Sequence, residues 1–96
     1  MLKIPHTKDM KQVAQRLIWF KSSRDALDDP YIFMAHVMTY GTVEDVLIIK
    51  RTLGEEAFKE ALDHAPPGIM DAKSWNYWNL VMERFPTPPL PKRKIP

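Results

Sequence analysis

The chain has 96 residues, a formal net charge of +2 and no cysteine. Without cysteine it has no disulfide framework, thiolate zinc site or thiol nucleophile. The basic excess belongs to the C-terminus, because residues 1–91 contain 11 basic and 12 acidic side chains once Lys92, Arg93 and Lys94 are set aside. A folded nucleic-acid-binding domain usually carries its own basic face, so this distribution argues against that class. No apolar run or leader of membrane-spanning length is present, and we expect one cytoplasmic domain.

The first predicted helix covers residues 8–20, with Thr7 as its N-cap. Apolar residues recur there at intervals of three and four, which predicts one buried stripe made of Met10, Val13, Ala14, Leu17 and Ile18. Residues 22–29 are polar and predict a turn. A second helix begins after Asp29, with Pro30 at its first position, and runs over residues 31–40 to Gly41. Because it is apolar almost all round, we expect it at the centre of the domain or with one side against a partner, including a second copy of the chain.

The remaining predicted helices follow the same rules of capping and spacing. Thr42 and Asp45 form a capping-box pattern that opens a helix ending at Gly54. Its predicted buried side consists of Val43, Val46, Leu47, Ile49 and Leu53. A helix over residues 55–64 would bury Ala57, Phe58, Ala61 and Leu62. The last predicted helix is the aromatic segment 71–85, which Asp71 caps.

No segment alternates polar and apolar residues for long enough to predict a strand. The fold class is therefore all-α, a compact bundle of about five short helices in a domain over residues 1–85. Residues 86–96 contain five prolines, which exclude a helix or a central strand and predict an extended, Pro-rich basic arm in the polyproline-II conformation. A stiff arm loses little entropy on docking, so it favours a binding function over catalysis.

Catalytic, metal and cofactor sites are not indicated by the sequence. His6, His36 and His64 lie in three separate segments, and none is spaced from an acidic residue or a second histidine as metal ligands are. Only three glycines occur, and they form no phosphate-binding loop. The acidic pairs Glu44/Asp45 and Glu55/Glu56 fall in the first turns of helices, where negative charge complements the helix dipole. We expect a protein that is not an enzyme and that has no metal and no cofactor.

A DNA-binding helix-turn-helix is the alternative, formed by the two helices that meet at Gly54. The second of these helices, over residues 55–64, has four acidic residues and one lysine, and phosphates would repel it. A plain helical hairpin is therefore favoured over a transcriptional regulator.

The C-terminal aromatic helix and the arm are the predicted partner-binding region. Trp75, Trp78, Met82 and Phe85 share one side and predict a core stripe, while Tyr77 lies on a second, partly apolar face. Tyrosine and tryptophan are enriched at interface hot spots, and the arm fits the proline-rich basic pattern that aromatic grooves accept. The predicted binding residues are Trp75, Tyr77, Trp78, Val81, Arg84, Phe85, Pro88, Pro89, Leu90, Pro91, Lys92 and Arg93.

Several segments together resemble a known family. They are residues 41–46 (GTVEDV), 53–62 (LGEEAFKEAL), 70–78 (MDAKSWNYW) and 88–91 (PPLP). This order is similar to that of small α-helical bacterial proteins encoded beside nucleotidyltransferase toxins of the abortive-infection type, which are presumed antitoxins. The resemblance covers residues 30–96 and implies a protein that neutralises its toxin by direct binding, while the toxin carries the chemistry. It does not identify the contact residues, which come from the physical argument above.

Overall fold

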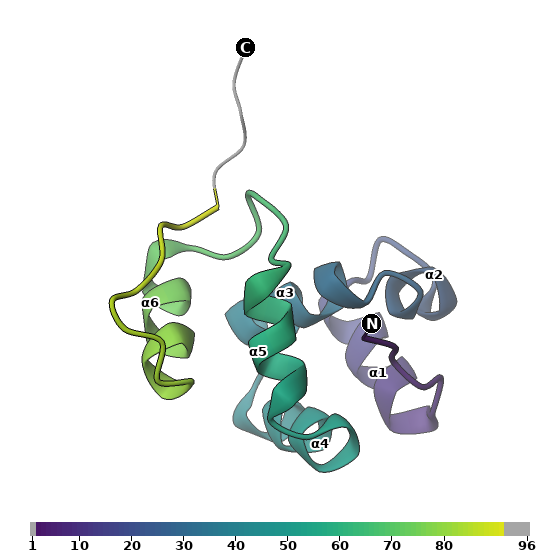
Figure 1. Ribbon diagram of the computed structural model, residues 1–96. Coiled ribbons are helices and arrows are strands. Elements are labelled where there is room, and N and C mark those ends of the chain that lie inside the picture. The colour runs from purple at the N-terminus through teal and green to yellow at the C-terminus, as the bar shows by residue number, and fades with distance from the viewer. Residues whose placement is uncertain (1, 92–96) are drawn as a thin grey trace.

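One apolar helix organises the structure. The computed structural model describes residues 2–91, and in this range α3 (Pro30–Tyr40) contacts all of the other helices. These are α1 (Lys8–Leu17), α2 (Ser23–Leu27), α4 (Val43–Leu53), α5 (Glu56–Asp63) and α6 (Ala72–Val81) (Figure 1). The buried side chains of α3 are Phe33, Met34, Ala35, Val37 and Met38. The described residues contain helices and no strand, which confirms the all-α class. Helix α3 is apolar almost all round because other helices pack against it on several sides.

The predicted helix starts are confirmed by their capping contacts. The side chains of Thr7, Asp29, Thr42 and Asp71 each accept a hydrogen bond from the backbone N–H three residues later. At Thr42 the capping box is complete, since the backbone N–H of Thr42 also donates to Asp45 at 2.9 Å. Such contacts satisfy donors that a helix start leaves unpaired.

Two glycines mark the ends of α3 and α4 for different reasons. Gly54 has a φ of +85°, a backbone conformation that glycine adopts without strain. Gly41 has an ordinary φ, but a Cβ placed on it would lie 2.5 Å from the carbonyl oxygen of Val37. The turn from α3 to α4 therefore needs the small residue because the two backbone segments approach closely.

The predicted turn over residues 22–29 was wrong, because it contains a helix, and two helix ends also differ from the prediction. Within the polar segment 22–29, Ser22 caps the short helix α2 through the backbone N–H of Asp25 at 3.1 Å. Helix α1 ends at Leu17, so that Trp19 and Phe20 lie in the turn that follows. Helix α6 ends at Val81 rather than at residue 85, and Glu83 takes a left-handed φ of +59°. A left-handed residue just past the last turn is a common way to stop a helix.

Past Glu83 the chain reverses and runs back along α6 (Figure 1). The indole Nε1 of Trp75 donates to the carbonyl oxygen of Pro88 at 2.7 Å, and Leu90 packs against the core. The described part of the Pro-rich segment thus contacts its own domain.

The C-terminal helix is attached to the bundle mainly through Trp78. Its ring stacks on Phe58 of α5 with centroids 4.9 Å apart, and its Nε1 donates to the carbonyl oxygen of Met38 at 2.7 Å. These contacts fix the face that α6 turns inward.

The Cα radius of gyration is 12.9 Å, typical of a compact domain of about 100 residues. Among the described residues, none of the helices is both long and apolar enough to cross a membrane.

Candidate protein-binding groove

Helix α4 exposes two apolar side chains that we expected in the core. Val43 is 78% exposed and Leu47 is 54% exposed, whereas Ile49 is fully buried. At 100° per residue, Leu47 and Ile49 point about 200° apart, so a helix that buries Ile49 must turn Leu47 outward. The predicted buried side of this helix was therefore wrong for Val43 and Leu47, since the helix carries more apolar residues than one stripe can bury.

The orientation of α4 is fixed by an ion pair to α1. The buried carboxylate of Asp45 accepts hydrogen bonds from both terminal nitrogens of Arg16, one of them at 2.9 Å. The hydrogen bonds from Arg16, and those from Thr42, hold the pKa of Asp45 below its usual value. Asp45 also raises the pKa of Arg16. Because the Asp45 carboxylate is fully used by Arg16 and Thr42, its role is structural. This contact holds one face of α4 against α1 and leaves the opposite face toward solvent.

The two exposed side chains border a groove between α4 and α6. The groove has a volume of about 550 Å³, and Tyr77 of α6 faces it across from Val43 and Leu47. The charged residues in its lining are Asp71 and Lys73, both near the start of α6. The remaining lining residues are Val37, Met38, Thr39, Gly41, Thr42, Val46, Ser74 and Trp78. We call this set of residues the α4/α6 groove.

Three apolar residues of α6 lie next to one another outside the core. Tyr77, Leu80 and Val81 are 58%, 56% and 45% exposed, and residues three and four apart share a helix face. Tyr77 belongs both to this stripe and to the groove, and its ring meets Trp78 edge-on at 5.5 Å. Tyr77 and Val81 were among the predicted binding residues, and their exposure leaves both available to a partner.

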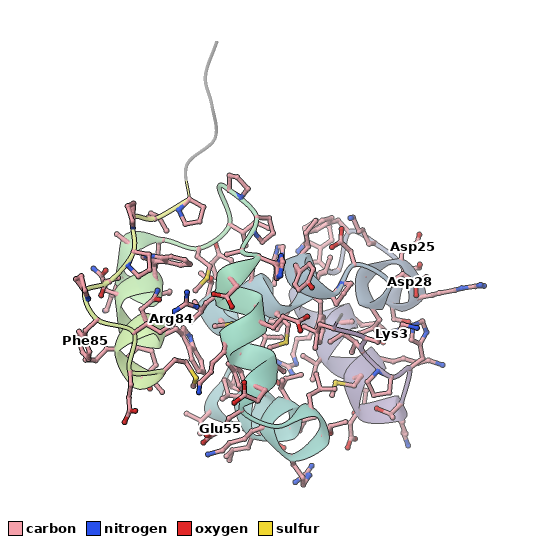
Figure 2. All side chains as sticks on the ribbon, viewed as in Figure 1. Lys3, Asp25, Asp28, Glu55, Arg84 and Phe85 are labelled. Carbon is pink, nitrogen blue, oxygen red and sulfur yellow. The ribbon has the colours of Figure 1, made fainter. Side chains whose placement is uncertain are left out.

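Other predicted binding residues are engaged within the chain. Trp75 and Trp78 are only 4% and 7% exposed, so neither offers much area to a partner, although Trp78 lines part of the groove. Arg84 pairs with Asp63 of α5 at 2.6 Å, and Figure 2 shows it directed toward that helix while Phe85 stands at the outer edge.

The Pro-rich segment divides in a similar way. The carbonyl oxygen of Pro88 is used by Trp75, and Leu90 packs against the core. Phe85 and Pro89 are exposed, and Pro91 is half-buried. Predicted residues Lys92 and Arg93 lie outside the described residues.

The groove offers apolar contact rather than reactive groups. Seven of its lining side chains are aliphatic or aromatic, five are polar or charged, and the lining residues of the described chain include no histidine. Asp71 caps α6 by accepting from the backbone N–H of Ser74 at 2.7 Å, which lowers its pKa. A groove of this kind can hold apolar side chains of another molecule and orient them through a few polar groups at its ends.

The three histidines are dispersed over the fold. His6 contacts Asp28 at 3.1 Å, His36 contacts the carbonyl oxygen of Ile32 at 2.9 Å, and the ring of His64 stacks on Tyr31 at 4.7 Å. Over residues 2–91, acidic and histidine side chains form no group of three that could hold a metal ion.

The helical hairpin of α4 and α5 presents an acidic second helix. Its inner face, consisting of Ala57, Phe58, Ala61 and Leu62, is buried as predicted. Glu56 and Asp63 are exposed, and Glu60 accepts a hydrogen bond from the hydroxyl of Tyr31 at 2.8 Å, which lowers the pKa of Glu60. Glu56 and Asp63 pair with Lys59 and Arg84, but acidic side chains still outnumber the single lysine of α5, so charge continues to disfavour α5 as a DNA-reading helix.

The sequence prediction missed Val43 and Leu47 as surface residues, whereas it placed Leu80 with Tyr77 on the second, partly apolar face of the C-terminal helix. The available signal was an excess of apolar residues, since Val43, Val46, Leu47, Ile48, Ile49 and Leu53 are too many for one buried stripe.

Comparison with models of known protein families, with curated protein sequences and with solved structures finds no match.

Proposed function

We propose that this protein is an antitoxin that has no enzymatic activity and neutralises a nucleotidyltransferase toxin by binding it directly. The observation that carries the proposal is the α4/α6 groove, in which Val43, Leu47 and Tyr77 expose apolar surface around a concave site. The resemblance of residues 30–96 to presumed antitoxins supplies the class of partner. Exposed apolar surface is costly in water and marks interaction sites when it is contiguous.

The apolar lining of the groove suits a helix of the partner as the bound element. An amphipathic helix places side chains at positions i, i+3 or i+4 and i+7 into an apolar groove of this kind. The exposed stripe of Tyr77, Leu80 and Val81 extends the same surface along α6. The central contacts would then be Leu47 and Tyr77, because apolar and aromatic anchors at the middle of an interface carry most of the binding energy.

The charge of the folded part suits such a partner. Residues 1–91 carry one more acidic than basic side chain, and α5 exposes Glu56 and Asp63, which pair with Lys59 and Arg84 within the chain. A toxin that transfers nucleotides must attract polyphosphate or RNA, so its own surface near the active site is basic. Complementary charge of this kind speeds association more than it strengthens the complex.

The first experiment identifies the partner and then tests the groove. The tagged chain is used to purify partners from its native host, and a recovered nucleotidyltransferase is co-expressed with the chain in a growth assay. We expect the wild-type chain to restore growth. The variants Leu47→Asp and Tyr77→Asp should fail to do so, with affinity reduced about tenfold or more, because a carboxylate would be buried against apolar surface.

A matched control places the same carboxylate elsewhere. Gln15→Asp changes an exposed residue of α1 and should protect like the wild type. Circular dichroism must show that all three variants fold. If no nucleotidyltransferase binds, the antitoxin proposal fails. If one binds and both groove variants still protect, the function stands and the groove assignment is wrong. Recovery of specific DNA fragments in place of a protein would favour the regulator.

A further inference from the structure

A second exposed apolar surface lies away from the α4/α6 groove and has no role in the proposed function. Trp19 and Phe20, in the turn after α1, are 78% and 58% exposed, and Tyr40 at the end of α3 is 63% exposed. Their rings form a continuous row with His36 between Phe20 and Tyr40. The successive ring centroids are 5.7, 6.3 and 6.1 Å apart. We call Trp19, Phe20, His36 and Tyr40 the aromatic patch.

The exposure of this patch follows from where α1 ends. Ile18 is the last fully buried residue of that segment, and the backbone N–H of Lys21 turns back to the carbonyl oxygen of Ile18 at 3.2 Å. This turn directs Trp19 and Phe20 outward. Tryptophan is usually highly buried in folded proteins, and the other described tryptophans, Trp75 and Trp78, are in the core.

The patch is separate from the groove on the surface of α3. His36 and Tyr40 are one helical turn apart and share a face. The groove instead uses Val37, Met38 and Thr39 of the same helix, and none of the four patch residues lines it. The groove and the patch therefore share no residue, although Tyr40 lies between the groove residues Thr39 and Gly41 in the chain.

We propose that the aromatic patch is a self-association surface, which pairs with the same patch on a second copy of the chain. The exposed fractions of Trp19, Phe20 and Tyr40 amount to about two whole aromatic residues, or on the order of 300–500 Å². A stable dimer buries about 800 Å² on each subunit, of which the apolar centre is roughly this size and the rest is polar rim. The patch thus supplies the centre of a two-fold interface, in which the aromatic patch of one subunit packs against the aromatic patch of the other.

Charge favours a second copy as the occupant. The full chain has 14 basic and 12 acidic side chains, a net charge of only +2, so two copies approach without strong long-range repulsion. A net charge near zero promotes association of like molecules, whereas a strongly charged domain stays apart from its copies. Tryptophan, tyrosine and histidine also carry polar ring groups, which can hydrogen-bond to water at the rim of an interface while the rest of the ring is buried.

The test uses the purified full-length chain alone, so it is independent of any toxin. Analytical ultracentrifugation over a concentration range of about a hundredfold measures the mass, because dimer formation follows mass action. We expect the wild-type chain to approach twice its monomer mass of 11.2 kDa at the high end. Trp19→Ser should weaken dimer formation about tenfold or more. Phe85→Ser removes an aromatic residue that is 65% exposed but outside the patch, and should leave dimer formation unchanged.

Fluorescence quenching gives a second measurement. Trp19 is accessible to acrylamide in the monomer while Trp75 and Trp78 are shielded, so the quenchable fraction of the emission should fall as the protein is concentrated. A chain that stays monomeric over the whole range overturns the proposal. So does a dimer that Trp19→Ser leaves intact, or one that Phe85→Ser weakens equally.

Discussion

The ion pair between Arg16 and Asp45 gives the sharpest test of how the bundle is held together. We consider Asp45→Asn, which keeps the size of the side chain and removes its charge. Asp45 is 1% exposed and accepts from both Arg16 and the backbone N–H of Thr42. An asparagine there would turn its NH₂ group toward one of these donors. The substitution therefore weakens both the α4 capping box and the tie to α1, without creating a cavity.

The expected loss in free energy of unfolding lies between the value for breaking a surface ion pair and the value for breaking a buried one. Breaking a buried ion pair costs about 3–5 kcal/mol, whereas exposed pairs contribute at most about 1 kcal/mol. The side chain of Arg16 is 52% exposed, which reduces the cost of leaving it unpaired. With the weakened cap included, we expect Asp45→Asn to lower the free energy of unfolding by about 2–3 kcal/mol. For a domain of this size the melting temperature should fall by about 10–20 °C.

The same group predicts a pH dependence with a definite sign. Because the pKa of Asp45 is lowered in the folded state, its contribution is fully present above the pKa of an unfolded aspartate, about 3.9. The contribution is lost as the pH falls through the lowered folded value. The stability difference between wild type and Asp45→Asn should therefore be constant near neutral pH and shrink below about pH 4.

Urea denaturation followed by circular dichroism, at several pH values, measures both effects. Asp25→Asn is the control, since it makes the same change at an exposed position in the first turn of α2 and should cost less than about 0.5 kcal/mol. The reasoning is refuted if Asp45→Asn melts as the wild type does, or if the stability difference is unchanged in acid.

Three further predictions concern backbone approach, a buried amide and the C-terminal segment. Gly41→Ala should cost about 1–3 kcal/mol in a thermal melt, because its Cβ would lie 2.5 Å from the carbonyl oxygen of Val37; an unchanged melt would contradict this. Asn79→Leu should be close to neutral in urea, because it removes the buried Oδ1 that has no partner among the described residues but also the 2.9 Å hydrogen bond from Nδ2 to the carbonyl oxygen of Trp75. Deletion of residues 86–96 should lower the melting temperature by leaving the Trp75 indole without its acceptor, whereas a free arm would leave it unchanged.

Helix positions were largely predictable because they depend on local rules. Thr7, Asp29, Thr42 and Asp71 cap helices in the structure as their types and spacing predict. The end of α6 was less predictable, since the left-handed residue there is Glu83 rather than a glycine. Nothing in the local sequence distinguishes Glu83 as a stop, and the reversal also depends on contacts with residues far along the chain.

The face that each helix buries was harder to predict than its ends. Val43 and Leu47 have the same apolar character as Ile49, and tertiary contacts such as the pairing of Asp45 with α1 decide which side turns inward. That pairing joins residues 29 positions apart, which periodicity within one helix cannot reveal. In the C-terminal helix the spacing correctly predicted that Trp78 faces the core and Tyr77 faces outward, but it was wrong for Phe85, which lies past the end of α6 and is exposed.

The last turn of α3 contributes to two surfaces at once. Thr39 lines the α4/α6 groove, while Tyr40, the next residue, belongs to the aromatic patch. A ligand that shifts this turn from one side changes the geometry on the other. Any resulting coupling is thermodynamically reciprocal, so the factor by which a groove partner alters dimer affinity equals the factor by which dimer formation alters partner affinity. The protein's response to its partner would then depend on its own concentration.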